Sequence, residues 1–201
     1  DVVITIVSSD TGEATVTSTL TFTPANWDTP QIATITGIDD DIIDGSQTST
    51  ITVSVDDANS DDDFDGVADQ TVSVSTTDDD VAGFTITETE GSTTVTEAGS
   101  TDTFDVVLNA QPDSNVVLTV SSSDTGESTV HGSTPSNNTI TFTSANWDTP
   151  QAFTVTGVDD DLVDGTVSST ATVSVVDAVS DNNFDGVADQ TVSVSTTDDD
   201  V

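Results

Sequence analysis

Apolar and polar residues alternate one by one along much of this chain. Phe153 and Val155 are separated by a threonine, and Val192 and Val194 are separated by a serine. A period of two places the apolar side chains on one face of an extended strand and the hydroxyl side chains on the other. Clusters of Gly, Pro, Asn and Asp separate these segments and indicate turns. No segment has the period of an amphipathic helix, so the pattern predicts an all-β protein.

The second half of the chain shows this alternation most completely. The ranges expected to form strands are about 84–89 with a continuation at 93–96, 103–108, 115–121, 139–143, 151–158, 168–177 and 191–197. Short strands at this spacing, each with one apolar and one hydroxyl-bearing face, are typical of two antiparallel sheets packed face to face. The predicted fold is therefore an immunoglobulin-like antiparallel β-sandwich.

Long stretches of the sequence occur twice. Residues 71–81 recur without change as residues 191–201, and the Ala-Asn-Trp-Asp-Thr-Pro-Gln segment at 25–31 recurs at 145–151. Repetition of this kind indicates tandem copies of one structural unit. The second copy differs from the first by an insertion at about 131–138.

The repeat predicts two tandem domains. Residues 83–201 form a complete unit, and residues 1–82 form a unit that lacks its first strands, because nothing ahead of Asp1 corresponds to residues 84–114. We expect the chain to be an internal segment of a longer tandem array. Neighbouring repeats of the same chain are the expected partners, and self-association into fibres is a further expectation.

The charge of the chain restricts its other partners. It has 38 Asp and Glu residues, no Lys or Arg, and a net charge of -38. Nucleic acids and anionic lipid surfaces are bound through basic side chains, so neither is an expected partner. No apolar run is long enough to cross a bilayer, so direct membrane insertion is not expected. Such a surface attracts cations, and repulsion among its acids opposes folding unless cations bind.

Enzymatic activity is not expected. The chain has no Cys and a single His, His131, with no nucleophile placed beside it in the sequence. A surface loop within the insertion is the better interpretation of His131. Trp27 and Trp147 each stand shortly before a Pro and are interpreted as packing at the end of a domain, with carbohydrate stacking as the alternative. The Asn-Asn-Thr pattern at 137–139 is a weak glycosylation sequon.

Acidic residues concentrate in connections that the sandwich places at one end. Because neighbouring strands run in opposite directions, the segments after the strands expected at 93–96, 115–121, 151–158 and 191–197 share an end. Their acids are Glu97, Asp124, Glu127, Asp159, Asp160, Asp161, Asp164, Asp198, Asp199 and Asp200. Ca²⁺ takes six to eight oxygen ligands and favours carboxylates on flexible loops. The sequence therefore predicts a calcium site here, with a set of solvated acidic loops as the alternative.

The first unit repeats this cluster as far as the unit extends. Its matching acids are Asp10, Glu13, Asp39, Asp40, Asp41, Asp44, Asp78, Asp79 and Asp80. Four separate segments supply the acids and both copies repeat them, which favours a metal site over solvated loops. Identical acids in each unit also favour a structural role over catalysis.

A second calcium site is predicted in the loop before the last strand of each unit. Positions 1, 3, 5 and 9 of an EF-hand-like loop are Asp181, Asn183, Asp185 and Asp189 in the complete unit and Asp61, Asp63, Asp65 and Asp69 in the first. The bidentate Glu usual at position 12 is missing, and no helices are expected on either side. A hairpin turn with solvated Asp residues is the alternative.

The complete unit resembles the Calx-beta domain, a module of the calcium-regulatory part of sodium/calcium exchangers and of many large bacterial surface proteins. The resemblance rests on Val-Thr-Glu-Ala-Gly at 95–99, Ile-Thr-Phe at 140–142, Val-Asp-Asp-Asp at 158–161 and Thr-Asp-Asp-Asp at 197–200. It implies that the matching acids bind Ca²⁺, namely Glu97, Asp124, Asp159, Asp160, Asp161 and Asp198 to Asp200. The Asn-Trp-Asp-Thr-Pro-Gln segment resembles repeats of bacterial adhesin-like proteins.

The sequence alone is compatible with three functions. The first is a calcium-binding structural repeat in the stalk or fibre of a long extracellular adhesin, in which Ca²⁺ rigidifies the domains and their junctions. The second is an adhesion module that binds glycan or another ligand directly, and the third is a calcium-sensing regulatory domain. Near-identical repeats favour the structural function, so a secreted, cell-surface location is expected.

Overall fold

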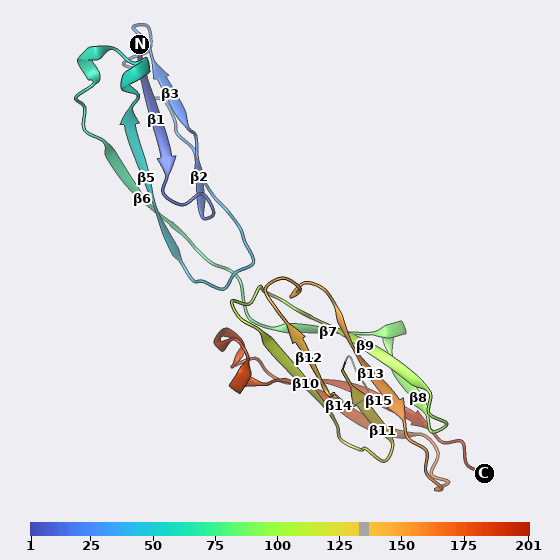
Figure 1. The fold of residues 1–201 in the computed structure, drawn as a ribbon. Helices are drawn as coiled ribbons and strands as arrows, with labels where there is room; N and C mark the ends of the chain where they lie inside the picture. The colour runs from blue at the N-terminus through green and yellow to red at the C-terminus, as the bar shows by residue number, and fades with distance from the viewer. Residues whose placement is uncertain (133–136) are drawn as a thin grey trace. The chain divides into compact units, whose positions relative to one another are not determined.

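The computed structural model describes residues 1–132 and 137–201 (Figure 1). The chain forms two compact units, Asp1–Asp79 and Asp80–Val201. Among the described residues, no helix is long and apolar enough to cross a membrane. Part of the predicted insertion, residues 133–136, lies outside the described residues.

One sheet of the second unit has five strands. In order across the sheet they are β12 (Thr139–Phe142), β10 (Val116–Ser122), β14 (Val167–Val175), β15 (Gln190–Thr197) and β8 (Thr93–Thr96). Neighbouring strands are antiparallel except β15 and β8, which run parallel. The expected antiparallel pairing therefore holds for every pair in this sheet but the one that joins β8 to the last strand.

The other sheet of the second unit has four antiparallel strands. Their order is β11 (Ser128–His131), β13 (Gln151–Gly157), β9 (Thr101–Leu108) and β7 (Phe84–Glu88). The predicted first strand is thus divided between the sheets, β7 in this one and β8 in the other. The short 3-10 helix η3 (Thr89–Gly91) connects β7 in one sheet to β8 in the other. Strand β7 ends there because Glu90 (φ 59°) and Gly91 (φ 80°) adopt left-handed backbone conformations.

Apolar side chains of both sheets meet in a closed core. Phe104 of β9 and Phe153 of β13 are fully buried, with ring centroids 5.5 Å apart. Along β10 in the opposite sheet, Val116, Leu118 and Val120 are buried and alternate with less buried residues. Alternation in the sequence is therefore alternation between core and surface, and the predicted all-β, immunoglobulin-like sandwich is confirmed.

Strand β11 is absent from the sequence prediction. It pairs with β13, and the register joins His131 to Thr154. His131, expected in a surface loop, instead ends this strand and is half-buried. The strand escaped prediction because it is four residues long and contains a single apolar residue, Val130, so it shows no alternation.

The first unit contains counterparts of strands β10 to β15. Its larger sheet has the order β3 (Thr19–Phe22), β1 (Val2–Ser8), β5 (Gln47–Val55) and β6 (Gln70–Thr76), and its smaller sheet consists of β2 (Ala14–Val16) and β4 (Ile35–Gly37). The register is the same in both units, since Ile4 pairs with Val55 as Leu118 pairs with Val175. Within residues 1–79, all of which the structure describes, no strand corresponds to β7, β8 or β9.

Short 3-10 helices occupy the loop before the last strand of each unit. They are η1 (Asp57–Asn59) and η2 (Asp62–Phe64) in the first unit and η4 (Asp177–Val179) and η5 (Asn182–Phe184) in the second. Each second helix is capped by an aspartate, because Asp61 and Asp181 accept the N–H groups of residues 63 and 183. This side-chain hydrogen bond satisfies a donor that the helix start leaves free.

Candidate metal site

Backbone hydrogen bonds gather the acidic segments at one end of the second unit. The N–H of Glu97, directly after β8, donates to the carbonyl of Thr197 at the end of β15 (3.0 Å). The carbonyl of Glu127, directly before β11, accepts the N–H of Val158 after β13 (2.9 Å). The segments that follow β8, β10, β13 and β15 therefore share one end of the sandwich.

Three carboxylates at this end form a compact group. One carboxylate oxygen from each of Glu97, Asp198 and Asp200 lies within 4.8 Å of the others. Two oxygens bound to one Ca²⁺ at 2.3–2.6 Å are at most about 5 Å apart, so this spacing fits shared coordination. The group offers only oxygen ligands, which favours a hard cation over zinc or a soft transition metal.

Several of these carboxylates are buried without a hydrogen-bond partner. Glu97 is 1% exposed and Glu127 is 7% exposed. Among the described residues, the Oε2 atoms of both and the Oδ2 atom of Asp200 have no partner. Buried charges in proteins are normally paired or bound to a metal, and this chain has no Lys or Arg to pair with them. The donor set therefore fits a bound cation.

Burial and mutual repulsion raise the pKa values of these acids. Burial, followed by the negative charges of Asp198 and Asp160, raises the pKa of Glu97 to about 7. Burial is also the leading cause that raises the pKa of Glu127 and of Asp200. A cation beside them would favour the charged forms and reverse these shifts. Proton binding and cation binding therefore compete at this end of the unit.

Asp198 is the anchored member of the group. Its Oδ2 accepts the N–H of Gly165 (2.8 Å), and its Oδ1 accepts the N–H of Asp200 (2.7 Å). These two hydrogen bonds lower the pKa of Asp198 and keep it charged, and the bond from Gly165 has the larger effect. Gly165 has a φ of +77°, which favours glycine. Sequence reasoning missed Gly165, although the same glycine recurs in the first unit as Gly45.

The remaining predicted acids of this unit surround the compact group. Those whose charges raise the pKa of Glu97, Glu127 or Asp200 are Asp124, Asp159, Asp160, Asp161, Asp164 and Asp199. Asp124 and Asp160 also shape their own turns, since their Oδ1 atoms accept the N–H groups of Gly126 (3.0 Å) and Leu162 (2.7 Å). Direct metal binding by these six acids stays a prediction.

The first unit contains the matching acids but no match for Glu97. Burial, followed by the charges of Asp44 and Asp40, raises the pKa of Glu13. Oδ2 of Asp78 accepts the N–H of Gly45 (2.7 Å), as Asp198 accepts that of Gly165. The other acids predicted for the first repeat are the exposed Asp10, Asp39, Asp41 and Asp79 and the half-buried Asp80, which is the first residue of the second compact unit. Within the described ranges, no three of these acids meet the 4.8 Å spacing.

The second predicted calcium loop is held by hydrogen bonds. In the second unit Asp181 is buried, and its carboxylate accepts the N–H groups of Asn183 (3.0 Å) and Ser114 (2.7 Å). Burial acts to raise the pKa of Asp181, but these hydrogen bonds outweigh it and the net shift is downward. The described residues of neither loop form a group of three close ligand atoms. Calcium binding by these loops stays a prediction.

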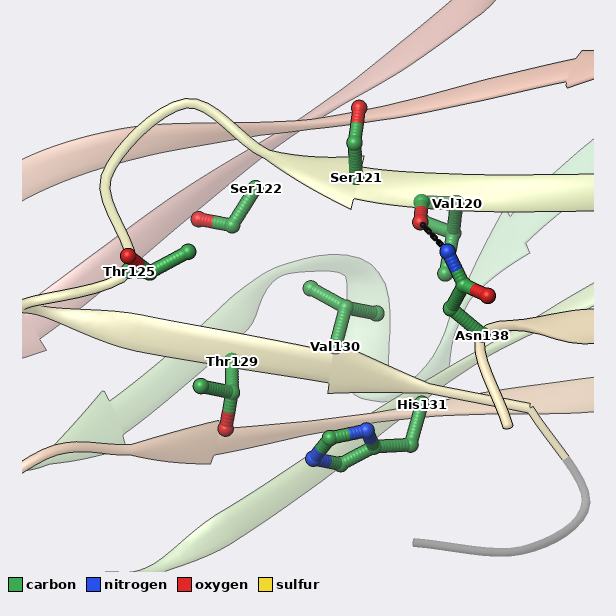
Figure 2. A pocket seen from close by; sticks show the side chains of 8 residues that line it. All are labelled: Val120, Ser121, Ser122, Thr125, Thr129, Val130, His131 and Asn138. Atoms are coloured by element: carbon green, nitrogen blue, oxygen red, sulfur yellow. Dashed lines mark hydrogen bonds between the residues drawn. The ribbon is translucent and has the colours of Figure 1, made fainter. Parts of the chain in front are cut away.

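A separate hollow of about 380 Å³ lies between β10 and β11 (Figure 2). His131 is the single titratable side chain that lines it, beside valines, hydroxyl side chains and Asn138. Asn138 donates its side-chain N–H to the carbonyl of Val120 (3.1 Å; Figure 2). Ser122 donates its hydroxyl to the carbonyl of Asp124 (2.9 Å). The described lining therefore contains one imidazole, several hydroxyl groups and no pair of acids.

Comparison with known proteins gives structural neighbours only. No protein-family model matches the chain, and no curated protein matches it. Domains 4 and 5 of the S-layer protein SbsC are 19% identical, with a TM-score of 0.42, over 96% of this chain and 70% of that chain. Domains 4–9 of the same surface layer protein are 19% identical, with a TM-score of 0.46, over 97% of this chain and 22% of that chain. The apo-form Calx CBD1 domain is 15% identical, with a TM-score of 0.39, over 60% of this chain and 100% of that chain.

These similarities are too low to carry a functional conclusion. The fold assignment rests on the two sheets and the core of the second unit described above. Membership of the Calx-beta family stays a prediction.

Proposed function

We propose that this chain is a calcium-binding structural repeat of an extracellular surface protein. The observation that carries the proposal is the group of Glu97, Asp198 and Asp200, in which buried carboxylate oxygens lack hydrogen-bond partners among the described residues. A buried carboxylate without a hydrogen-bond partner is costly in its charged form unless an opposite charge or a metal ion lies beside it. In a chain without Lys or Arg, a cation is the available counter-charge.

Calcium is the cation that these residues fit best. Ca²⁺ tolerates irregular arrangements of six to eight oxygens, whereas Mg²⁺ requires a near-ideal octahedron and retains several waters. Zinc prefers His and Cys ligands, and the group contains neither. Glu97, Asp198 and Asp200 come from connections after two different strands, β8 and β15, and such loops can adjust to a large ion.

The role we propose for Ca²⁺ is to stiffen the end of each sandwich. An ion shared by Glu97 and Asp198 links the segment after β8 to the segment after β15. An ion that binds only the folded form stabilises it by about 4 kcal/mol at a thousandfold excess over Kd. Without the ion, repulsion among the acids loosens the same loops.

A structural, non-enzymatic role at the cell surface fits the remaining properties. Two copies of the unit follow each other in one chain. Both carry the predicted acids other than Glu97, and both carry the glycine that anchors Asp78 or Asp198. Neighbouring repeats of the same chain are the proposed partners, and we propose that the protein assembles into fibres. Stiffened tandem sandwiches are what a stalk requires.

Calorimetric titration of the 201-residue chain with Ca²⁺ tests the proposal. Glu97→Gln keeps the shape of the side chain but removes its charge, and we expect the affinity of the second unit to fall at least about tenfold, the loss of one charged ligand. Glu90→Gln is the matched control, because Glu90 is exposed and outside the group. Equal affinity in both variants would refute the assigned site, and no heat of binding in the parent chain would refute the calcium function.

A further inference from the structure

The first unit exposes an apolar sheet face that the second unit covers. Phe64 is 44% exposed, whereas Phe184 at the same repeat position is fully buried. Val72 is 49% exposed, whereas its counterpart Val192 is 3% exposed. The local sequences differ only in Asp62 and Asp63, which stand where the second unit has Asn182 and Asn183. The difference in exposure therefore arises from what packs against the two phenylalanines.

The exposed face contains a hollow of about 370 Å³. Val2, Ile4 and Phe22 contribute to its lining, together with Trp27 and Phe64. The lining is overwhelmingly apolar, and an apolar hollow of this size open to water is normally an interaction site. In the second unit, the strand equivalent to β1 is buried on the matching face by the other sheet.

The smaller sheet of the first unit ends in an unpaired edge. In the second unit β13 begins at Gln151 and pairs with β9 over residues 151–156. The matching residues of the first unit, 31–36, form a strand only from Ile35, and within the described chain β4 pairs with β2 alone. Ile32, in the part that is not strand, is 83% exposed. An unpaired edge beside an apolar face is a template for an added strand.

We propose that the first unit is an acceptor for the first strands of a further copy of this repeat, a segment with the chemistry of residues 84–108. The second unit shows the fit directly, because there β9 pairs with β13 and buries Phe104, Val106 and Leu108. A β9-type strand pairs antiparallel with residues 31–36 and fills the hollow with its alternate apolar side chains.

The same segment also completes the other sheet and the acid cluster. In the second unit β8 pairs in parallel with β15, and Glu97 follows directly. A β8-type strand on the free edge of β6 would bring an equivalent glutamate to Glu13, whose pKa is already raised by burial and its neighbours. This second consequence rests on the proposed calcium function, whereas strand docking does not.

Hydrogen exchange tests the docking on the full chain. A second copy of residues 83–114 is joined directly ahead of Asp1, which reproduces the connection to Asn115, the counterpart of Asp1. We expect the amides of residues 31–36 to exchange at least about tenfold more slowly than in the 201-residue chain, because paired strand amides open rarely. The control is the same extended chain with Phe104→Asp and Val106→Asp in the added copy, which should give no protection.

Three results would overturn the proposal. The first is unchanged exchange at residues 31–36 with rapid exchange throughout the added copy. The second is equal protection with the Asp-substituted copy, since docking would then not depend on apolar side chains. The third is slow, concentration-dependent exchange at residues 31–36 in the 201-residue chain itself, which would mean that the face is covered by a second first unit.

Measurement with Ca²⁺ and with chelator separates this proposal from the calcium function. Protection of residues 31–36 in chelator supports docking whether or not Ca²⁺ binds. Additional protection of residues 10–13 by Ca²⁺ in the extended chain, lost on Glu97→Gln in the added copy, supports the completed acid cluster. Docking without any effect of Ca²⁺ would overturn the acid-cluster consequence and leave strand docking standing.

Discussion

Phe64 and Phe184 occupy one repeat position in different surroundings, which predicts unequal effects of truncation. Phe184 is 0% exposed and Phe64 is 44% exposed. Phe→Ala in a closed core costs about 3–5 kcal/mol of unfolding free energy, because the lost transfer energy and the remaining cavity both contribute. About half of the Phe64 side chain already faces water and the hollow beside it is open, so we expect Phe64→Ala to cost about 1–2 kcal/mol.

Each unit contains one tryptophan, so fluorescence can follow the two units separately. In a Trp27→Phe background, Trp147 reports urea unfolding of the second unit with and without Phe184→Ala. In a Trp147→Phe background, Trp27 reports the first unit with and without Phe64→Ala. Equal costs for the two truncations would refute the reasoning, since Phe64 would then be as buried in solution as Phe184.

Further predictions concern the acid cluster. Excess chelator at matched ionic strength should lower the melting temperature of the second unit, and an unchanged melting curve would contradict the role of Ca²⁺. The pKa of Glu97 is raised to about 7, so calorimetry should show calcium affinity rising with pH up to about 7 and levelling off above it, a dependence that Glu97→Gln should weaken. In chelator the unfolded chain loses this proton first, so the stability of the second unit should fall as pH rises from about 4.5 to about 7. Gly165→Ala should destabilise the second unit by about 1–2 kcal/mol because its φ is +77°, whereas Gly186→Ala, with open space around it, should change the urea midpoint little.

The sandwich was predictable wherever a strand carries several alternating apolar residues. Strands β10, β13 and β15 each have three buried positions in alternation, and the sequence places all three within a few residues. Strand β11 has a single large apolar residue and owes its existence to pairing with β13, which a local pattern cannot show. The same limit applies to the parallel pair of β8 and β15, because pairing direction depends on the path of the chain between them.

The location of the candidate site could be predicted from the sequence, but the arrangement of its side chains could not. Alternating strand directions are enough to bring the acidic connections to one end. The burial of Glu97 depends on the close approach of two backbones, since a Cβ on Gly157 would clash with the carbonyl of Thr96. Likewise, the anchoring of Asp198 depends on the left-handed backbone at Gly165. Neither contact follows from the spacing of acids in the sequence.

The parallel pairing of β8 with β15 has a mechanical consequence. Tension that enters β8 from its N-terminal side and leaves β15 from its C-terminal side pulls two parallel neighbours in opposite directions. Four residue pairs, Val194 with Thr93 through Thr197 with Thr96, then bear the load together in shear and cannot be unzipped one at a time. Glu97 and Asp198 follow these strands directly, so an ion held between them would lock the sheared joint at its end. We therefore expect this pair of strands to resist tension along its length better than strands whose residue pairs separate one after another.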